Sequence, residues 1–270
     1  MLSELFTFEF MRLAFVGGSV LALIAPVIGH YMVARRYANI SDSLAHISLL
    51  GILAGHLLTA SPLLLGLAVS IIAGVLMEYL RQKNLSSGDG ILVLVTTFSI
   101  ALVSIIQQLS GTRQSLESLL FGSILTITAT DIIIVTIASA ITALVLYIHR
   151  RALLCTILDS STAKLQGFHP ARLNYLLIIL SAVVVAVSIK LLGGLLIGGI
   201  MIIPVLTSHL LSSSFYRSIG VSMVISVGSM WVGLSASWLL DIPSGAGIVA
   251  AASSVYILAA LYALTVSGEY

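Results

Sequence analysis

Long apolar stretches, separated by short polar segments, run through the chain from end to end. The pattern predicts nine membrane-spanning segments, at residues 10–34, 41–58, 62–80, 90–109, 129–149, 174–191, 194–212, 217–240 and 245–266. An α-helix needs about 20 residues to cross a bilayer, and most of these stretches reach that length. Segment 41–58 is short, and only Leu192 and Gly193 separate 174–191 from 194–212, so one of those two is expected to be partly re-entrant.

Composition identifies lipid as the solvent for most of the chain. Hydrophobic residues make up 59% and charged residues 8%, whereas a soluble globular protein carries about a quarter charged residues. The fold class is therefore all-α, a polytopic membrane protein with eight or nine transmembrane helices. The net charge of +2, with no basic stretch interleaved with aromatics, argues against a nucleic-acid partner. The single cysteine, Cys155, excludes an internal disulfide, and we expect a buried, inert thiol.

The positions of the cations predict an orientation. Lys and Arg fall in alternate connections, at residues 35–36, 81–83, 150–172 and 217. Short cytoplasmic loops are enriched in these residues. The N-terminus is therefore expected outside and the C-terminus in the cytoplasm. Acids precede the first cation, Arg12, so we interpret the first apolar stretch as a retained helix and not as a cleaved signal.

Two connections are longer than a simple turn. Segment 110–128 has a mixed pattern that is typical of a short external or re-entrant helix. Segment 150–173 is the longest cytoplasmic piece: Asp159 or Ser160 could cap a helix through Leu165, and Gly167 would end it. Such a helix would be a docking element by shape, and an ordinary loop is the alternative.

Asp42 and His46 form the sharpest candidate site. Four residues apart on a helix, they lie on one face about one turn apart. An ionisable side chain within a span costs roughly 2.5–3.5 kcal/mol, which makes it a functional candidate. A carboxylate and an imidazole in this arrangement can form half of a metal coordination shell, with the remaining ligands supplied from elsewhere. Alternatively, Asp42 caps its helix and His46 bonds a carbonyl.

Other ionisable residues have a sufficient structural explanation. Asp241 begins the turn Asp-Ile-Pro-Ser-Gly, where it could cap the last helix. Lys190 is expected to reach the outer interface. Anchoring, capping or a satisfied hydrogen bond accounts for the others near segment ends, namely His30, His56, His209, Glu78 and Asp131.

Enzymatic motifs are absent from the sequence. There is no G-x-x-x-x-G-K-[ST], no H-E-x-x-H and no G-x-S-x-G. The chain is therefore not expected to be an enzyme or to bind ATP in the usual way. If it is a primary active transporter, a separate chain supplies the ATPase.

Four stretches, in order along the chain, resemble the permease subunits of bacterial zinc, manganese and iron ABC importers. They are ARRYANISDSLAHISLLG (34–51), LLFGSIL (119–125), VSIKLLGGLLIGGIMIIPVLTSHLL (187–211) and LLDIPSGAGIV (239–249). Departures from the family pattern occur at Ser43, Ala45 and Leu50, and at Ser160 and Ser161 where an acidic pair is usual. These departures leave both candidate ligands intact.

The resemblance implies one permease domain over residues 1–270, in a bacterial plasma membrane. It implies a homodimer with two cytoplasmic ATP-binding subunits and an extracytoplasmic metal-binding protein. It assigns metal binding to Asp42 and His46, and places Asp241 on the outer side, where it could accept the ion or contact a gate. Segment 150–173 becomes the ATPase-coupling element, with Ala163, Gln166 and Gly167 at its centre.

The expected mechanism is alternating access, with zinc favoured over manganese or iron because His with carboxylate suits Zn²⁺. No covalently bound cofactor is expected, and ATP would bind to the partner subunit. Three alternatives remain: a proton-coupled secondary transporter driven through intramembrane acids, a siderophore- or vitamin-type ABC permease with a wider path, and a membrane-embedded enzyme. The last would need a fuller catalytic constellation than Asp42 and His46 provide.

Overall fold

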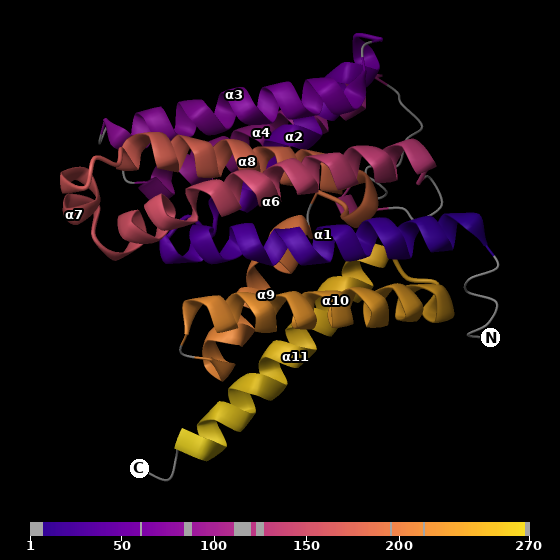
Figure 1. Ribbon diagram of the computed structural model, residues 1–270. Helices are drawn as coiled ribbons and strands as arrows, with labels where there is room; N and C mark the ends of the chain where they lie inside the picture. The colour runs from indigo at the N-terminus through magenta and orange to yellow at the C-terminus, as the bar shows by residue number, and fades with distance from the viewer. Residues whose placement is uncertain are drawn as a thin grey trace.

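A computed structural model describes residues 8–59, 61–83, 88–110, 120–122, 127–194, 196–212 and 214–267. Within these ranges the elements are all α-helical (Figure 1). They are α1 (Glu9–Ala34), α2 (Ile40–Leu57), α3 (Pro62–Gln82), α4 (Gly88–Ser110), α6 (Ala129–Leu158), α7 (Ser160–Leu165), α8 (Pro170–Leu192), α9 (Ile197–Leu211), α10 (Phe215–Leu240) and α11 (Ser244–Ser267). The all-α prediction is confirmed.

Eight of these helices are long and apolar enough to cross a membrane, and each matches a predicted segment. Of the predicted segments, the exception is 194–212, whose helix α9 has 15 residues. At a rise of about 1.5 Å per residue it spans about 22 Å, less than the roughly 30 Å of a hydrocarbon core. The sequence predicted an irregularity at this junction, and the structure locates it in the second of the two segments.

The short helix still completes a passage between the two ends of the bundle. The last turn of α8 lies beside the start of α6, where Lys190 donates to Asp131 at 2.6 Å. The start of α10 lies beside the end of α1, where Ser218 contacts His30 at 3.0 Å. The end of α1 in turn lies beside the end of α6, where Arg35 donates to the Thr156 carbonyl oxygen. The last turn of α8 and the start of α10 therefore lie beside opposite ends of α6. The turn after α8 and α9 together connect them.

Helices α1, α2 and α8 occupy the centre of the bundle. More than half of the most apolar part of each is buried, whereas α3, α4, α6, α10 and α11 are buried over a third or less. In Figure 1, α3 forms one outer layer, α8, α6 and α1 follow, and α10 and the oblique α11 form the opposite side. The outer helices keep their apolar side chains exposed, which is stable in lipid and not in water.

Glycines allow the backbones of the central elements to touch. A Cβ at Gly29 of α1 would overlap the Met201 carbonyl oxygen of α9. At Gly193, where φ is +81°, a Cβ would overlap the backbone at Leu120 and Gly122. At Gly245 a Cβ would lie 2.7 Å from the Phe121 carbonyl oxygen. The second, third and fourth stretches of family resemblance therefore meet at one place in the fold.

The connection at 150–173 differs from prediction at its start and agrees at its end. Helix α6 runs nine residues beyond the predicted boundary at 149, so Arg150 and Arg151 are helical. Asp159 then caps α7 by accepting bonds from the Ser161 and Thr162 amides. Gly167, with φ of +84°, ends it. The predicted capped helix through Leu165 is confirmed, and the loop alternative is wrong.

Cys155 is a free cysteine of intermediate exposure whose Sγ lies 3.5 Å from Gln166 Oε1, so the expectation of a buried thiol is wrong. Most of the 110–128 connection, with its predicted short helix, lies outside the described residues.

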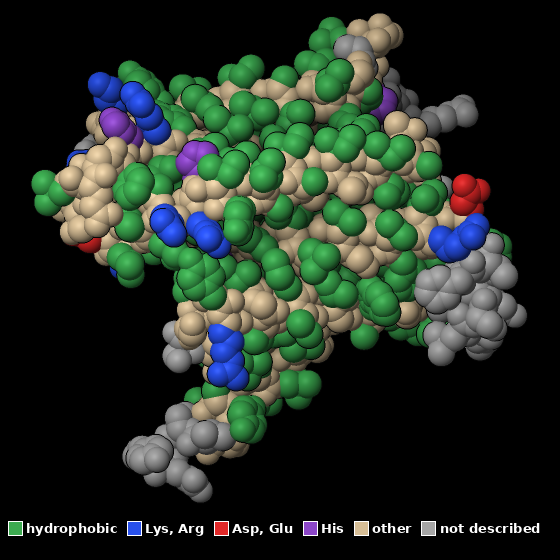
Figure 2. Space-filling view, in the orientation of Figure 1, with side chains coloured by type: hydrophobic (Ala, Val, Ile, Leu, Met, Phe, Trp, Pro, Cys, Tyr) green, Lys and Arg blue, Asp and Glu red, His purple; other side chains and the backbone are tan. Residues whose placement is uncertain are grey.

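Lys and Arg side chains gather at the end of the bundle where α7 lies (Figure 2). At the opposite end, Lys190 pairs with Asp131, whose carboxylate also closes a capping box with Thr128. The interpretation of Asp131 as a cap is confirmed. The orientation of the termini relative to the membrane stays a prediction.

The α1–α9 contact gives a test of the packing. We expect Gly29→Ala to lower the thermal stability of the purified protein, because the new methyl group would overlap backbone that cannot move aside. Overpacking of this kind costs about 1–3 kcal/mol. Gly228→Ala is the matched control, since nothing lies within 4 Å of its Cβ position. Equal melting temperatures for the two variants in detergent would contradict the close approach.

Candidate metal site and its cytoplasmic supports

Asp42 lies in the first turn of α2, where the helix dipole stabilises a carboxylate. The N-cap residue is Asn39, so capping does not explain Asp42. His46 follows one turn later, and its Nε2 lies 3.9 Å from Asp42 Oδ1. This distance is too long for a hydrogen bond. With bonds of about 2.0–2.2 Å, a tetrahedral ion holds two ligand atoms about 3.4 Å apart and the collinear limit is about 4.2 Å, so one ion fits between the two atoms at an angle wider than tetrahedral.

The two ligands differ in exposure. The His46 side chain is 8% exposed and that of Asp42 is 51% exposed. Gly198 of α9 faces Asp42, and a Cβ there would lie 3.8 Å from Asp42 Cβ, an ordinary contact distance. The first and third stretches of resemblance therefore meet here. Because Gly198 carries no side chain, space remains beside the carboxylate.

As a metal site, the Asp42–His46 pair would be an incomplete coordination shell. Among the described residues, no group of three His, Cys, Asp or Glu side chains could hold one metal ion. Asp241 does not join the pair: it is exposed and ends α10 in the left-handed conformation, with φ of +52°. It terminates the preceding helix, so the expectation that it caps the last one is wrong. A tetrahedral site normally has four ligands, so Asp42 and His46 supply half of one.

The other candidate histidines are held by neighbouring groups. His30 is fully buried; its Nδ1 lies 2.9 Å from the Pro26 carbonyl oxygen and its Nε2 3.0 Å from Ser218 Oγ. The His209 ring meets the His30 ring edge-on at 5.3 Å. His56 Nδ1 lies 2.9 Å from the Ile52 carbonyl oxygen. Satisfied hydrogen bonds account for His30 and His56, as expected.

Glu78 is a buried carboxylate whose role the sequence pattern did not predict. Its carboxylate is 1% exposed. Tyr37 Oη donates to it at 3.2 Å, Gln82 at 2.8 Å and Asn174 at 3.1 Å. Glu78 is neither an anchor nor a cap, and the expectation of either role is wrong. Tyr37 and Asn174 lie 41 and 96 residues from Glu78 in sequence, so no local pattern predicted this cluster.

Glu78, Tyr37, Gln82 and Asn174 form what we call the Glu78 cluster. Arg35 links this cluster to the end of α6, next to α7. Arg35 donates to Asn174 Oδ1 at 2.6 Å and to the Thr156 carbonyl oxygen at 2.8 Å, close to the end of α6. The Arg81 guanidinium lies 3.9 Å from the Tyr37 ring centroid. Burial, and secondarily the charge of Glu78, raises the pKa of Tyr37 to about 12. The phenol therefore remains a hydrogen-bond donor throughout the physiological pH range.

The turn between α1 and α2 places Arg35 and Tyr37 in this cluster. Arg36 adopts the left-handed conformation, with φ of +60°. The Tyr37 amide donates to the Met32 carbonyl oxygen at 2.7 Å and the Arg36 amide to that of Val33 at 3.0 Å. These two bonds form a Schellman motif, which reverses the chain sharply at a helix end.

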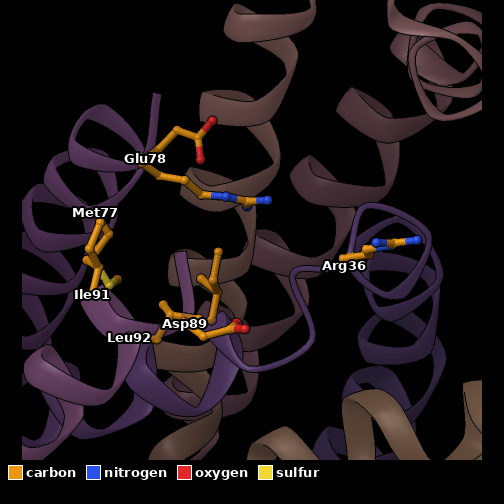
Figure 3. A pocket seen from close by; sticks show the side chains of 8 residues that line it. Arg36, Met77, Glu78, Asp89, Ile91 and Leu92 are labelled. Atoms are coloured by element: carbon orange, nitrogen blue, oxygen red, sulfur yellow. The ribbon is translucent and has the colours of Figure 1, made fainter. Parts of the chain in front are cut away.

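A cavity of about 220 Å³ lies next to Glu78. Glu78 of α3 and Asp89 of α4 approach it from above and below in Figure 3, with Met77 and Ile91 along one side. Arg36 and Arg81 also line it. Two carboxylates and two guanidinium groups balance, so the cavity favours neither a cation nor an anion. We interpret the residues that line the cavity as part of the support for the α1–α2 turn.

At the α7 end, the predicted coupling residues separate into two kinds. Gln166 and Gly167 are exposed, but Ala163 is fully buried and supports the helix from within. Leu158 and Leu165 flank α7 and are 85% and 89% exposed. The exposure of these two leucines could not be predicted from the sequence, because an apolar residue near a span end can be either buried or exposed. Leu158 is the last residue of α6 and Leu165 the last residue of α7, so both lie at the α7 end of the bundle.

A comparison with family models matches the ABC 3 transport family over residues 7–263. The chain belongs to this family. It is a multi-pass membrane protein and an ABC transporter permease of the metal type.

Relatives within the ABC 3 transport family are named for different metals. The chain is 29% identical over 252 residues to the high-affinity zinc uptake system membrane protein ZnuB of Haemophilus influenzae, covering 93% of this chain and 97% of that protein. It is 25% identical over 257 residues to the manganese transport system membrane protein MntC of Halalkalibacterium halodurans, covering 95% and 88%. The solved structure of PsaBC from Streptococcus pneumoniae in complex with Fab has the same fold, with a TM-score of 0.86, 23% identity and coverage of 96% and 95%.

The Glu78 cluster is open to a direct test. We expect Glu78→Ala to lower the apparent melting temperature by several degrees, because Tyr37, Gln82 and Asn174 lose their shared acceptor. A buried donor without a partner costs about 1–3 kcal/mol. Glu78→Gln keeps the volume and one acceptor oxygen, so its loss should be smaller. A Glu78→Ala protein as stable as the parent would show that the carboxylate does not hold these helices together.

Proposed function

We propose that this chain is the permease of an ABC importer that moves a divalent transition metal into the cytoplasm, with zinc favoured. The observation that carries the proposal is the Asp42–His46 pair, spaced for one ion and lacking further ligands among the described residues. An incomplete shell suits transport, because a saturated tetrahedral cage would retain its ion. His46 imidazole favours Zn²⁺ over Mn²⁺.

A second copy of the chain would complete the site. Asp42 is half exposed in a bundle whose surroundings are lipid. A charge in contact with hydrocarbon is costly, so this face must be covered by water or by another protein surface. In a two-fold homodimer, each copy contributes the same patch. Two Asp42–His46 pairs would then provide four ligands for one ion.

Energy would come from two ATP-binding subunits docked at α7. Leu158, Leu165 and the exposed Gln166 and Gly167 form the contact surface in this proposal, with Ala163 beneath them. Arg35 and the Glu78 cluster link that surface to the α1–α2 turn, from which α2 and its ligand pair begin. Movement of α7 would therefore reach the metal ligands through hydrogen-bonded side chains.

Direction and topology follow from the same scheme. The cation-rich α7 end faces the cytoplasm, the N-terminus lies outside, and residues 1–270 form one membrane domain of a bacterial plasma membrane. An extracytoplasmic binding protein delivers the ion near Asp241 at the opposite end. The chain carries out no ATP hydrolysis itself.

Metal uptake by variants tests the ligand pair. In cells or proteoliposomes containing the complete transporter, we expect Asp42→Ala and His46→Ala each to reduce Zn²⁺ uptake at least about tenfold, as is usual for loss of a metal-site residue. His56→Gln on the same helix is the control and should transport normally. Parallel measurements with Mn²⁺ and Fe²⁺ identify the preferred ion. Normal uptake by both alanine variants would refute the site.

Co-purification tests the docking surface. We expect Leu165→Ser to weaken retention of the ATP-binding subunit and to lower metal-dependent ATP hydrolysis, because an apolar contact is lost. Burying one leucine contributes about 1.5–3 kcal/mol. Lys164→Ser is the control on the same short helix. If Leu165→Ser retains the ATPase as well as the control does, α7 is not the contact.

A cap substitution examines the same helix independently. Bonds from the Thr162 hydroxyl and from the Ser161 and Thr162 amides hold the pKa of Asp159 below its usual range. The cap is therefore ionised above the ordinary carboxyl pKa, and its contribution is lost as the pH falls through the lowered value. We expect Asp159→Ala to increase amide hydrogen exchange over residues 160–166 at neutral pH, and Asp159→Asn to increase it less. Unchanged exchange in Asp159→Ala would contradict the capping role.

A further inference from the structure

A groove of about 520 Å³ opens on the outer surface of the bundle between α1, α6 and α10. Along most of its length the lining is apolar, with Leu23 and Val27 from α1, Ala143 and Leu146 from α6, and Met223 from α10. The groove plays no part in the metal site, and it lies on three helices that are long enough to cross a membrane.

Its dimensions match one leaflet of a bilayer. On α1 the lining extends from Val20 to Tyr31, which at about 1.5 Å per residue is about 17 Å. Half of a hydrocarbon core is about 15 Å thick. Along α1 the groove, with Tyr31 at its polar end, is therefore about as long as one leaflet is thick.

The end of the groove nearest α7 is polar and cationic. Arg150 lies there together with Tyr31, Tyr147 and Tyr216. The Arg150 guanidinium is held 4.3 Å from the Tyr147 ring centroid, so its position is defined. No Asp or Glu lines the groove. An anion placed at this end would meet one fixed guanidinium and phenolic hydroxyl donors, with no opposing carboxylate.

We propose that this groove binds an anionic phospholipid of the leaflet on the α7 side. One acyl chain occupies the apolar part, and the phosphate headgroup lies against Arg150. Arg pairs with phosphate through two parallel N–H bonds, and the tyrosines lie at the depth of the headgroups, where such side chains are favoured. The lipid would contact α1, α6 and α10 together.

Charge distinguishes the lipid from a second copy of the chain. The α7 end carries an excess of cations: Arg35, Arg36, Arg81, Lys83, Arg150, Arg151, Lys164, Arg172 and Arg217 against Glu78, Asp89 and Asp159. The same end of another copy would bring mainly like charge to Arg150. A zwitterionic lipid would bring its own cation to the site. An anionic headgroup is the complementary occupant.

Native mass spectrometry of the purified full-length chain tests the proposal. The protein, delipidated in detergent, is titrated with dioleoyl phosphatidylglycerol and, separately, with dioleoyl phosphatidylcholine. We expect preferential retention of phosphatidylglycerol. Arg150→Gln should reduce that retention about fivefold, the effect of one basic residue near an anionic surface. Arg151→Gln, the next residue and absent from the lining, should bind as the parent does.

A second variant addresses the apolar part of the groove. Ala143→Trp fills it without changing charge and should reduce retention of phosphatidylglycerol, while circular dichroism verifies that the protein is still helical. Equal retention of the two lipids, or equal effects of Arg150→Gln and Arg151→Gln, would overturn the proposal. So would a lipid-free dimer that Ala143→Trp converts to monomer, because the occupant would then be a second copy. These readouts do not depend on transport.

Discussion

Charge in a lipid environment is the constraint on which this structure depends. An ionised side chain within a membrane-spanning protein must be paired, bonded or exposed to water. Glu78 meets the requirement through three donors from three segments, and Arg35 extends the cluster to α6. The cluster holds α1, α3, α6 and α8 together at the α7 end. Asp42, half exposed and 3.9 Å from His46, is the contrasting case, and an incomplete set of ligands is consistent with the transport role proposed for the pair.

Glycine positions determine how closely the central helices can surround that site. The contact of Gly29 with α9, and the junction of Gly193 with residues 120–122, bring backbone against backbone. Close approach leaves little freedom for α9 to slide along α1. Gly198 acts in the opposite sense, because there the missing side chain leaves space beside Asp42. Gly193 thus allows tight packing and Gly198, five residues later, leaves open volume.

The α7 end combines a rigid support with an exposed surface. α7 has a defined start at Asp159 and a defined end at Gly167, so its orientation is fixed despite its six residues. Leu158, just before its cap, and Leu165, its last residue, are both highly exposed. Arg35 connects the end of α6 to the α1–α2 turn, and α2 carries the ligand pair.

The sequence by itself determined the features that depend on local chemistry. Hydropathy located eight spans, all but α6 to within a few residues at both ends, helical spacing paired Asp42 with His46, and cap residues marked both ends of α7. Tertiary structure decided the rest: the shortness of α9, the extension of α6 to Leu158, the burial of Glu78 and the exposure of Leu165. The reason is physical. Hydropathy and capping act between neighbours along the chain, whereas the environment of Glu78 is made by Tyr37 and Asn174, which lie 41 and 96 residues away in sequence.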